Sequence, residues 1–355
     1  MASPSLPAPD DDDRRGLNIR ALAAAAGVSI GTVSRALKNR AGVSDATRQT
    51  ILALAAELGY DQARLRPGRS LRVLFLLNRA HTARSANPFY PVVLQGVEEV
   101  WSEADGLVSF VVLAPADPVE RILRRHEAQA LIAAGYFEPE LLARIRASGL
   151  PLAVVDHFDP DCFCINDDNL QGAFAATRHL IAQGRERIAM ISGPPTHHSI
   201  ALRAHGYRKA LFEAGRLADP DLEITLDPRL HCEPASQAAM RQLLALPHPP
   251  DAVFAYNDET ALAAMRACQE AGVAVPRDIA FVGYDDIAAA ALATPPLATV
   301  RVDKEELGRE AARQLLQGRP AAGERLLPVQ LVLRESAVAS AAVAPAAATM
   351  GESAS

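Results

Sequence analysis

Apolar residues recur at helical spacing between residues 18 and 59, which predicts three short helices. Gly27 is the stop signal of the first helix, and Ser29 and Ser44 can cap the second and the third. The first two helices are joined by AGVS, a short glycine-containing connection that is typical of a helix-turn-helix. The predicted helices span about residues 18–26, 29–37 and 44–58, with Val28, Val33, Leu37 and Ile51 in their common core.

From residue 72 onward, short apolar runs alternate with longer amphipathic segments. Short apolar runs are typical of strands buried on both faces, and their alternation with helices indicates parallel sheets covered on both sides. The βα units are too many for one sheet, so we predict an α/β body of two doubly wound parallel-sheet subdomains, with a ligand cleft between them. The predicted strands are 73–77, 108–113, 131–135, 152–156, 187–193, 252–258 and 279–286, and the predicted helices are 92–104, 139–148, 169–183, 199–214, 235–246 and 259–271.

These patterns divide the chain into five regions. A disordered arm at 1–15 precedes the helix-turn-helix domain at 16–60, and a charged linker broken by Pro67-Gly68 occupies 61–71. The body covers 72–337, and the Ala-rich stretch 338–355, which has no leucine heptad, is expected to be a flexible tail rather than an assembly coil. Within the body, the N-subdomain comprises about 72–164 plus 300–318, and the C-subdomain comprises about 165–298 plus 324–337.

The net charge of −6 is an average over two unlike parts of the chain. Residues 14–72 contain eleven basic and three acidic residues, so this segment carries +8 and the remainder carries −14. A small basic head on an acidic body is the asymmetry expected when one domain contacts phosphates and the other does not. The charge distribution therefore favours a nucleic-acid partner for the first domain only.

Several classes of protein are disfavoured by absent signals. No apolar run approaches the ~18 residues needed to span a bilayer, and MASPSLPAPDDDDRRG lacks the basic start and apolar core of an export signal, so we expect a cytoplasmic protein with no membrane partner. The four cysteines lack metal-binding spacing and His197-His198 lacks a third ligand nearby, so no metal and no cofactor are predicted. The chain lacks a GxGxxG after a strand, a GxxxxGK[ST] and a GxSxG, so it is not expected to be an enzyme.

Four submotifs in residues 18–60 identify the first domain: AGVS, TVSRAL, VS-x-x-TR and ELGY. Together they closely resemble the headpiece of the LacI/GalR family of bacterial repressors. The resemblance implies that the start of the second helix enters the major groove of DNA. The residues expected to contact DNA there are Ser29, Ile30, Gly31, Thr32, Ser34, Arg35, Lys38 and Asn39.

The side chains of this helix are expected to have different roles in binding DNA. Arg35 can pair with guanine O6 and N7 through its guanidinium, with a phosphate contact as the alternative. The hydroxyls of the helix are expected to position it on phosphates, which carry no sequence information. Ile30 and Gly31 occupy the positions by which family members distinguish their operators; Ile30 offers only apolar contact to a thymine methyl and Gly31 offers no side chain.

The linker departs from the family pattern. Family members continue with Pro-Asn and a short hinge helix ending in a leucine that wedges into the minor groove, whereas YDQARLRPGRSL is about one helical turn shorter and carries Pro67-Gly68. Leu65 is the candidate for the wedge. Alternatively, Arg64 and the neighbouring arginines follow the DNA backbone or an adjacent minor groove.

The remainder, roughly 72–337, resembles the regulatory core of the family, which is similar to periplasmic sugar-binding proteins. Matching landmarks include NPFYPVVLQGVEE at 87–99, ALRAHGYRKAL at 201–211 and VPRDIAFVGYDD at 275–286. Carboxylates, amides and an arginine around an apolar ring platform suit the hydroxyl groups of a sugar. The candidate effector-binding residues are Phe89, Asp156, Asp167, Arg203, Asn257 and Asp285, of which the last three match positions that line the family's pocket. The alternatives are a turn or cap role for Asp285 and an ion pair within the cleft wall for Arg203.

The resemblance implies a transcriptional repressor that binds a near-palindromic operator. Its affinity for the operator is expected to be controlled by a small polar metabolite, a sugar or sugar derivative. A homodimer is expected, with the helix at 88–104, the helix at 118–125 and the segment around 70–80 at its interface. Two alternatives stay open: a regulator of the same family that responds to a purine or nucleoside, and an exported sugar-binding protein. The single aromatic candidate, Phe89, and the many acidic groups favour a polyol over a flat base.

Overall fold

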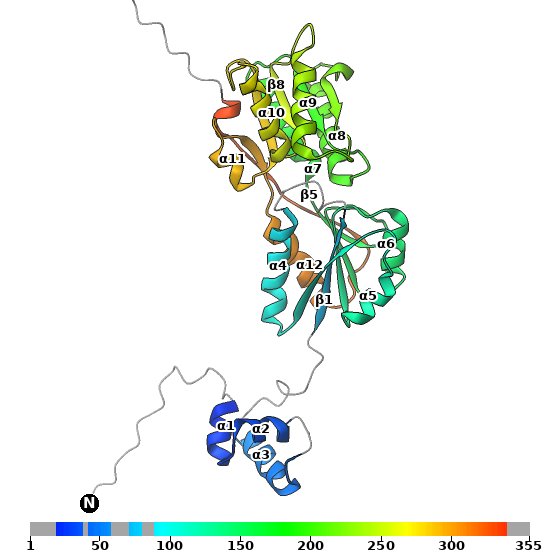
Figure 1. Ribbon diagram of the computed structural model, residues 1–355, viewed down its shortest axis with the longest axis vertical. Coiled ribbons are helices and arrows are strands. Elements are labelled where there is room, and N and C mark those ends of the chain that lie inside the picture. Colours follow the sequence, from blue (N-terminus) through cyan, green and yellow to red (C-terminus); the bar gives the residue numbers. More distant parts are fainter. Residues whose placement is uncertain (1–18, 38–41, 58–70, 80–88, 339–355) are drawn as a thin grey trace, which may run out of the picture. The chain divides into compact units, whose positions relative to one another are not determined.

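The computed structural model describes residues 19–37, 42–57, 71–79 and 89–338. The chain forms two compact units that divide after Leu71 (Figure 1). We refer to the described part of the first unit as the headpiece and to that of the second as the body.

The headpiece consists of three helices around a small apolar core. They are α1 (Ile19–Ala26), α2 (Ile30–Leu37) and α3 (Asp45–Glu57). Gly27 adopts a φ of +65° after α1, and the hydroxyls of Ser29 and Ser44 accept hydrogen bonds from the backbone N–H three residues on, at 3.1 and 3.3 Å. The predicted stop signal and both predicted caps are therefore confirmed. Val33 and Ile51 are buried in the core, and Val28 and Leu37 pack against it half-buried.

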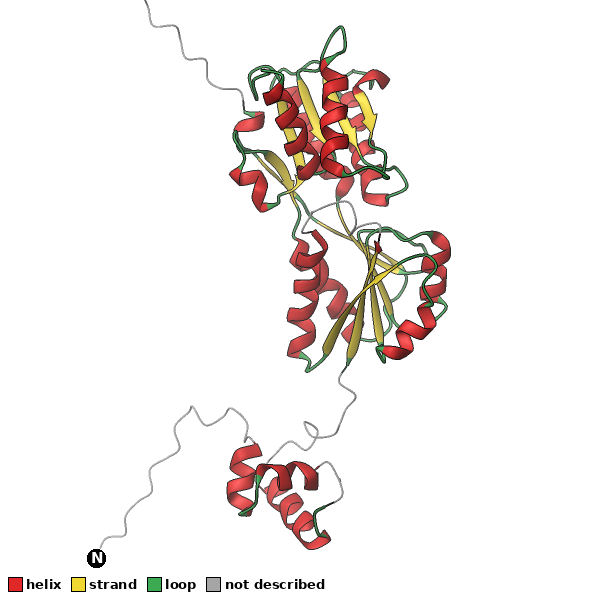
Figure 2. Ribbon diagram, viewed as in Figure 1, coloured by secondary structure: helices red, strands yellow, loops and turns green. Residues whose placement is uncertain are grey.

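The first lobe of the body is a six-stranded, fully parallel sheet with helices on both faces (Figure 2). Alternate side chains of the strand at 72–78 point to opposite faces of this sheet: Val73 and Phe75 pack with α4 and α12, and Leu74 packs with α5 and α6. The strand order is β2-β1-β3-β4-β5-β11. The elements are β1 (Arg72–Asn78), α4 (Phe89–Glu103), β2 (Leu107–Leu113), α5 (Val119–Arg125), β3 (Ala130–Ala134), α6 (Pro139–Arg146), β4 (Leu152–Val155), β5 (Phe163–Asp167), α12 (Lys304–Leu316) and β11 (Gly323–Leu327).

The second lobe repeats this order as β7-β6-β8-β9-β10-β12, with only β12 antiparallel to its neighbour. Met190 and Phe254 face α7 and α8, whereas Ile191 and Val253 face α9 and α10. The elements are α7 (Asn169–Ala182), β6 (Ile188–Ser192), α8 (His198–Glu213), β7 (Glu223–Thr225), α9 (Cys232–Leu244), β8 (Ala252–Ala255), α10 (Asp258–Glu270), β9 (Ala280–Asp285), α11 (Ala288–Leu292), β10 (Ala298–Arg301) and β12 (Gln330–Val332). Short 3₁₀ turns lie at Pro220–Leu222 and Glu335–Ala337. Two doubly wound parallel-sheet subdomains were predicted, and both are present.

The chain crosses between the lobes three times, and all three of the predicted subdomain boundaries differ from the structure. The strand β5, at 163–167, lies wholly in the first sheet, although 165–167 were assigned to the C-subdomain. The strand β11, at 323–327, also pairs with β5, although 324–327 were assigned to the C-subdomain. Conversely, β10 places 300–301 in the second sheet. These strands are polar or short, and their partner sheet is set by long-range pairing rather than by local pattern.

Helices cross closely at two glycines in the first lobe. A Cβ atom on Gly96 of α4 would lie 2.0 Å from the backbone oxygen of Glu305, and a Cβ atom on Gly308 of α12 would lie 1.9 Å from the backbone oxygen of Val93. Both obstacles are backbone atoms, which cannot rotate away as a side chain does. The absence of side chains at these two positions therefore sets the distance between α4 and α12.

We expect Gly96→Ala to destabilise the body by about 3 kcal/mol, because the added methyl forces the two helices apart and overpacks the core. Gln95→Ala is the control, since Gln95 is exposed on the same helix. Thermal unfolding of the body measures both variants. Equal melting temperatures for the two would show that the helix crossing tolerates a methyl group.

Among the described residues, no helix is long and apolar enough to cross a membrane. All four cysteines are free, and Cys162, Cys164 and Cys268 are buried. Burial raises the pKa of each of these three thiols, so they are neutral at physiological pH. They behave as small core residues, as expected from their spacing.

Candidate functional site

The first residues of α2 present a nearly bare surface. The Ile30 side chain is 46% exposed, although isoleucine is ordinarily buried. Next to it, the Gly31 position has only Ser29 Oγ and the Arg35 guanidinium nearby, at 3.7 and 3.9 Å from an added Cβ. The Ser29 and Thr32 hydroxyls lie 2.9 Å apart. This end of α2 is thus open for a partner to approach within van der Waals distance.

Arg35 lies along the same face of α2. Its Nε donates a hydrogen bond to the backbone oxygen of Gly31 at 3.1 Å, one turn earlier in the helix, and its side chain is exposed. The bond is local and solvent-accessible, so it costs little to exchange for a stronger partner. The predicted DNA-contacting residues at 29–32 and Arg35 therefore share one exposed helix start, and Ser34 belongs to the same helix. Lys38, Asn39, Arg64 and Leu65 lie outside the described residues.

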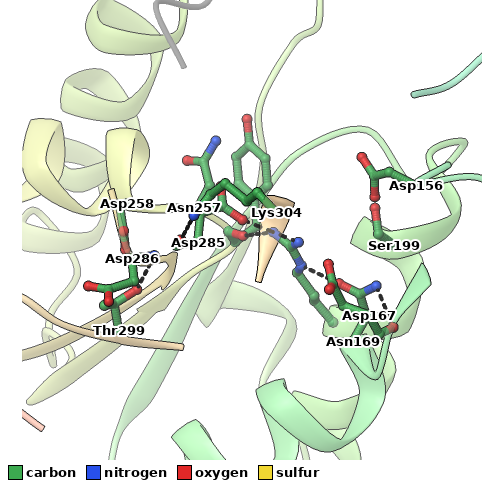
Figure 3. Close-up of polar contacts among 12 residues, drawn as sticks. Asp156, Asp167, Asn169, Ser199, Asn257, Asp258, Asp285, Asp286, Thr299 and Lys304 are labelled. Carbon is green, nitrogen blue, oxygen red and sulfur yellow. Dashed lines mark hydrogen bonds and ion pairs between the residues drawn. The ribbon is translucent and has the colours of Figure 1, made fainter. Parts of the chain in front are cut away.

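A cavity of about 360 Å³ lies in the body at the carboxyl ends of strands from both sheets. This is the position that the fold favours for a ligand. Five of the six predicted effector-binding residues line it: Phe89, Asp156, Arg203, Asn257 and Asp285. The other lining residues are Tyr90, Tyr136, Glu138, Pro194, Thr196, His197, Ser199, Ile200, Leu226, Asp227, Pro228, Leu230, Cys232, Ala235 and Tyr256. Figure 3 shows Asp285 and Asn257 beside one another, with Asp156 and Ser199 together in another part of the view.

Arg203, on α8, is held rigidly in the cavity wall. Its Nε donates to Asn169 Oδ1 at 2.8 Å, and its Nη1 donates to the Tyr256 backbone oxygen at 2.6 Å. Its Nη2 lies 3.4 Å from Asp285 Oδ1, and its guanidinium carbon lies 3.6 Å above the Tyr284 ring. The ion pair that was considered as an alternative role is thus present, and the same arginine also lines the cavity.

Two aspartates end strands in a strained conformation. Asp156 follows β4 with a φ of +58°, and Asp285 ends β9 with a φ of +102°. Positive φ values cost energy in residues other than glycine and cluster at functional sites. Both side chains are buried in the cavity wall. Asp285 is not a helix cap, since α11 begins at Ala288 with Ile287 as its N-cap residue.

Asp156 is held as a carboxylate by its neighbours. Its Oδ2 accepts a hydrogen bond from the Tyr90 hydroxyl at 2.9 Å and lies 3.6 Å from His197 Nε2. Burial raises the pKa of Asp156, but interactions with His197, Arg203 and Tyr90 outweigh burial, so the pKa lies below its usual value. An ionised carboxylate is a strong hydrogen-bond acceptor for a hydroxyl group.

The side-chain amide of Asn257 uses its oxygen within the protein and keeps its NH₂ group for other partners. Its Oδ1 accepts a hydrogen bond from the Thr260 backbone N–H at 2.9 Å and caps α10. The Nδ2 group is therefore the part of this side chain that can donate to a ligand. Asp285 supplies acceptors on the neighbouring strand, so the two side chains offer a donor beside an acceptor.

Asp167 does not line the cavity, contrary to its assignment as an effector-binding residue. It is buried at the end of β5, where the chain passes into the second lobe. Burial, followed by the negative charge of Asp156, raises the pKa of Asp167 well above its usual value. Its successor Asp168 caps α7 by accepting a hydrogen bond from the Gln171 N–H at 3.0 Å.

The cavity holds more aromatic side chains than the sequence interpretation supposed. Besides Phe89, the rings of Tyr90, Tyr136 and Tyr256 line it. Tyr136 directly follows the predicted strand 131–135, and Tyr256 lies near the end of the predicted strand 252–258, so their position along the sequence was an available signal. The argument that a single aromatic candidate disfavours a flat ligand is therefore wrong.

Asp258 lies just behind the cavity and titrates in an unusual range. Its Oδ2 accepts from the Ile287 N–H at 2.9 Å, and its Oδ1 lies 2.5 Å from the Thr299 hydroxyl. Burial raises the pKa of Asp258 to about 8, with the negative charge of Asp285 adding to the effect. Because this value exceeds the unfolded value of about 3.9, protonated Asp258 stabilises the body fully below pH 4, and the contribution is lost as the pH rises through 8.

We therefore expect Asp258→Asn to flatten the pH dependence of the unfolding free energy between about pH 5 and 8, a slope on the order of 1 kcal/mol per pH unit in the parent protein. Asparagine can accept from the Ile287 N–H through its amide oxygen, and it keeps a neutral polar group beside the Thr299 hydroxyl, which donates to Asp258 in the parent protein. Asp278→Asn is the control, since interactions with Arg277 lower the pKa of Asp278 to about 2, outside this window. Denaturant titrations at several pH values measure the slope. An unchanged slope in Asp258→Asn would contradict the assignment.

Among the described residues, no group of histidine, cysteine and acidic side chains is arranged to hold a metal ion. His197 pairs with Asp156, whereas His198 Nε2 lies 3.5 Å from Glu324 Oε1. The two adjacent histidines thus point to different carboxylates.

Two family models match parts of this chain. Residues 18–62 match the family model described as bacterial regulatory proteins, lacI family, and residues 177–337 match a periplasmic binding protein-like domain. The chain is 35% identical over 310 residues to the ribose operon repressor of Escherichia coli K12, covering 83% of this chain and 91% of the relative.

Solved structures extend the likeness over nearly the whole chain. A complex of the transcriptional regulator CelR with cellobiose has a TM-score of 0.68 at 31% identity and is matched over 90% of this chain and 99% of its own. The lac repressor dimer bound to operator and an anti-inducer has a TM-score of 0.70 at 27% identity, over 92% and 100% of the two chains. With the helix-turn-helix and the two-lobed body in place, the chain belongs to the LacI family of bacterial regulatory proteins and is a DNA-binding transcription regulator, not an enzyme.

Proposed function

We propose that this protein represses transcription by binding a near-palindromic operator as a homodimer, and that a neutral polyol in the body cavity controls the binding. The observation that carries the ligand class is Arg203, a cavity-lining cation already neutralised by Asp285. An anionic ligand would have to compete with this ion pair and approach two carboxylates. A neutral sugar meets donors and acceptors without that repulsion.

The DNA contact is proposed for the exposed start of α2. Ser29 and Thr32 would meet phosphates, Ile30 a thymine methyl, and Arg35 a guanine edge. Two headpieces related by a two-fold axis would meet two half-sites about one helical turn apart, and the order of the bases would mirror the symmetry of the dimer.

The dimer is proposed to form through the first lobe of the body. Leu107 and Phe110 are exposed apolar side chains on β2, an edge strand, and Leu71 precedes β1 with its side chain exposed. Exposed apolar side chains grouped on an edge strand support an interaction surface. The helices α4 and α5, which flank this strand along the chain, are the further proposed contributors. The lac repressor, which is similar to this chain, is a dimer on its operator.

Regulation is proposed to act through the cleft. A ligand that binds groups of both lobes favours the closed arrangement of the body, and it changes DNA affinity only as far as it binds one arrangement better than another. The proposed site of action is chromosomal DNA in the bacterial cytoplasm.

The names of the relatives support a carbohydrate, since they include a ribose operon repressor and a regulator solved with cellobiose. The nucleoside alternative gains from the four aromatic rings around the cavity, because flat bases stack on such rings. Both hypotheses place a sugar ring at Arg203, Asn257 and Asp285, and they differ in the chemical group that is attached to that ring.

The proposal is tested with the full-length protein in two measurements. Selection from random duplexes should recover a two-fold symmetric site, with salt-dependent binding by fluorescence anisotropy. Thermal unfolding across neutral sugars, sugar phosphates, nucleosides and free bases should show the largest stabilisation with a neutral, sugar-containing compound. Selection of no symmetric site, or stabilisation by sugar phosphates alone, would refute the corresponding half of the proposal.

A further inference from the structure

The cavity has two chemically different ends, and the sheet topology separates them. In the second lobe the strands run in the order β9-β8-β6-β7, and cavity-lining residues follow each of them. At a spacing of about 4.8 Å between neighbouring strands, the end at β9 lies roughly 14 Å from the end at β7. A single sugar ring is about half that length, so it fills one end and leaves the other open.

The end at β9 and β8 is polar. Asp285 ends β9, Asn257 follows β8, and Arg203 reaches over both to the Tyr256 backbone and to Asp285. These groups provide acceptors, a donor and a fixed positive charge within one small region. Such a set suits the hydroxyls of one sugar ring.

The end at β7 is apolar. The chain leaves β7 through Leu226, Pro228 and Leu230 and enters α9 at Cys232, and Ala235 completes this wall from the first turns of α9. Ile200, on α8, lines the cavity beside His197. The Leu230 side chain is 55% exposed, so an apolar group in the cavity can remove its surface from water.

The aspartate in this apolar segment does not make it polar. Asp227 is bound by Arg229, whose Nε and Nη2 both donate to the carboxylate, at 3.0 and 2.6 Å. The negative charge of Asp227 is thus neutralised by Arg229, which belongs to the same loop. Together with the leucines, this segment offers a ligand mainly carbon atoms.

We propose that the effector is a two-part molecule, a neutral sugar ring joined to an apolar, flat group, with the sugar at Asp285, Asn257 and Arg203 and the flat group against Leu226 and Leu230. This inference rests on the proposed function and specifies its ligand. The shared chemistry has two sources, an aryl glycoside and a nucleoside. A free monosaccharide or a fully polar disaccharide does not satisfy it.

The experiment compares matched ligands by isothermal titration calorimetry on the full-length protein. The pairs are methyl and phenyl β-D-glucoside, methyl and phenyl β-D-galactoside, and ribose and its nucleosides adenosine and uridine. In at least one pair, the ligand that carries the flat group is expected to bind about tenfold more tightly than the ligand that lacks it, which corresponds to about 1.4 kcal/mol. We call this the best pair. Cellobiose serves as the fully polar two-ring ligand. The pair that responds distinguishes an aryl glycoside from a nucleoside.

Leu230→Ser is expected to weaken binding of the two-part ligand more than binding of the simple sugar or methyl glycoside, and so to remove most of this advantage. Leu217→Ser is the matched control, since Leu217 is 87% exposed and does not line the cavity. Both leucines are exposed, so neither variant opens the core.

Three outcomes would overturn the inference: equal affinity for both members of every pair, tightest binding of cellobiose, or an equal loss for both members in Leu230→Ser. If no compound in the panel binds, the proposed function fails together with this inference. If simple sugars bind and the flat group adds nothing, only the two-part effector is refuted.

Discussion

Replacing Arg35 with alanine is expected to abolish discrimination between operator and scrambled DNA while leaving salt-sensitive binding to both. A bidentate arginine–guanine pair contributes about 1–3 kcal/mol of discrimination. A dimer loses two such pairs, about 2–6 kcal/mol, which corresponds to roughly 30-fold to 10⁴-fold in relative affinity. Arg35 is exposed, and among the described residues its side chain bonds to Gly31 of its own helix, so its removal should leave the headpiece folded.

The control is Arg35→Lys, which keeps the charge and loses the planar pair of donors. If Arg35 reads a base, lysine restores affinity in general but not full discrimination. If Arg35 contacts only phosphate, alanine weakens binding to all duplexes alike and reduces the salt slope by about 0.9 per phosphate. Anisotropy titrations of operator and scrambled duplexes at several salt concentrations separate the two cases. Full discrimination by the alanine variant would refute the base contact.

The strands that were predicted well are those that can be recognised from their own residues, because these form a continuous apolar run. In β1 and β3, every position after the first is buried or apolar, and burial on both faces makes such a run continuous. The strands β5, β10 and β12 were not predicted, and neither were β7 and β11. The strand β7 has only three residues, and β11, GERLL, has four exposed positions at the sheet edge. Pairing with β6 and with β5 makes them strands, and that pairing is invisible along the chain.

The candidate site was predictable where a polar residue ends a buried strand. Asp156, Asn257 and Asp285 all obey this rule, and all three line the cavity. Asp167 also ends a buried strand, but it does not line the cavity. The chain turns into the second lobe directly after it, where the Asp168 N–H donates to the Leu327 backbone oxygen at 2.9 Å.

Apart from Phe89, the aromatic and apolar residues that line the cavity were missed for two reasons. Tyr136 and Tyr256 also follow strand ends, but the rule that identifies the other cavity residues selects only polar side chains. Leu226 and Leu230 follow β7, which was not predicted, so nothing in the local pattern places them at a strand end. Polar cleft residues are easier to find by sequence because they interrupt apolar runs, whereas apolar cleft residues resemble core.

Asp285→Asn is expected to weaken effector binding by roughly 10-fold to 100-fold, the loss for one charge-assisted hydrogen bond of about 1.5–3 kcal/mol. Asparagine is chosen over alanine for two reasons. It tolerates positive φ, as Asp285 adopts at +102°, and its amide oxygen can still accept from Arg203. Alanine would leave the buried guanidinium without its closest carboxylate, and the body could unfold for that reason alone. Binding of operator by unliganded Asp285→Asn is expected to match the parent, because the DNA-contacting residues belong to a separate compact unit.

The neighbouring residue provides the control, since Asp286 also has a positive φ but does not line the cavity. It accepts hydrogen bonds from Arg301 and Arg334, each at 2.6 Å, so Asp286→Asn removes a carboxylate and weakens ion pairs without touching a ligand. Calorimetric titration with the best effector, and operator release on adding it, should change in Asp285→Asn and stay near the parent values in Asp286→Asn. An undiminished response in Asp285→Asn would place the effector elsewhere. An equal loss in both variants would mean that the response depends on the stability of this end of the sheet rather than on contact with the ligand.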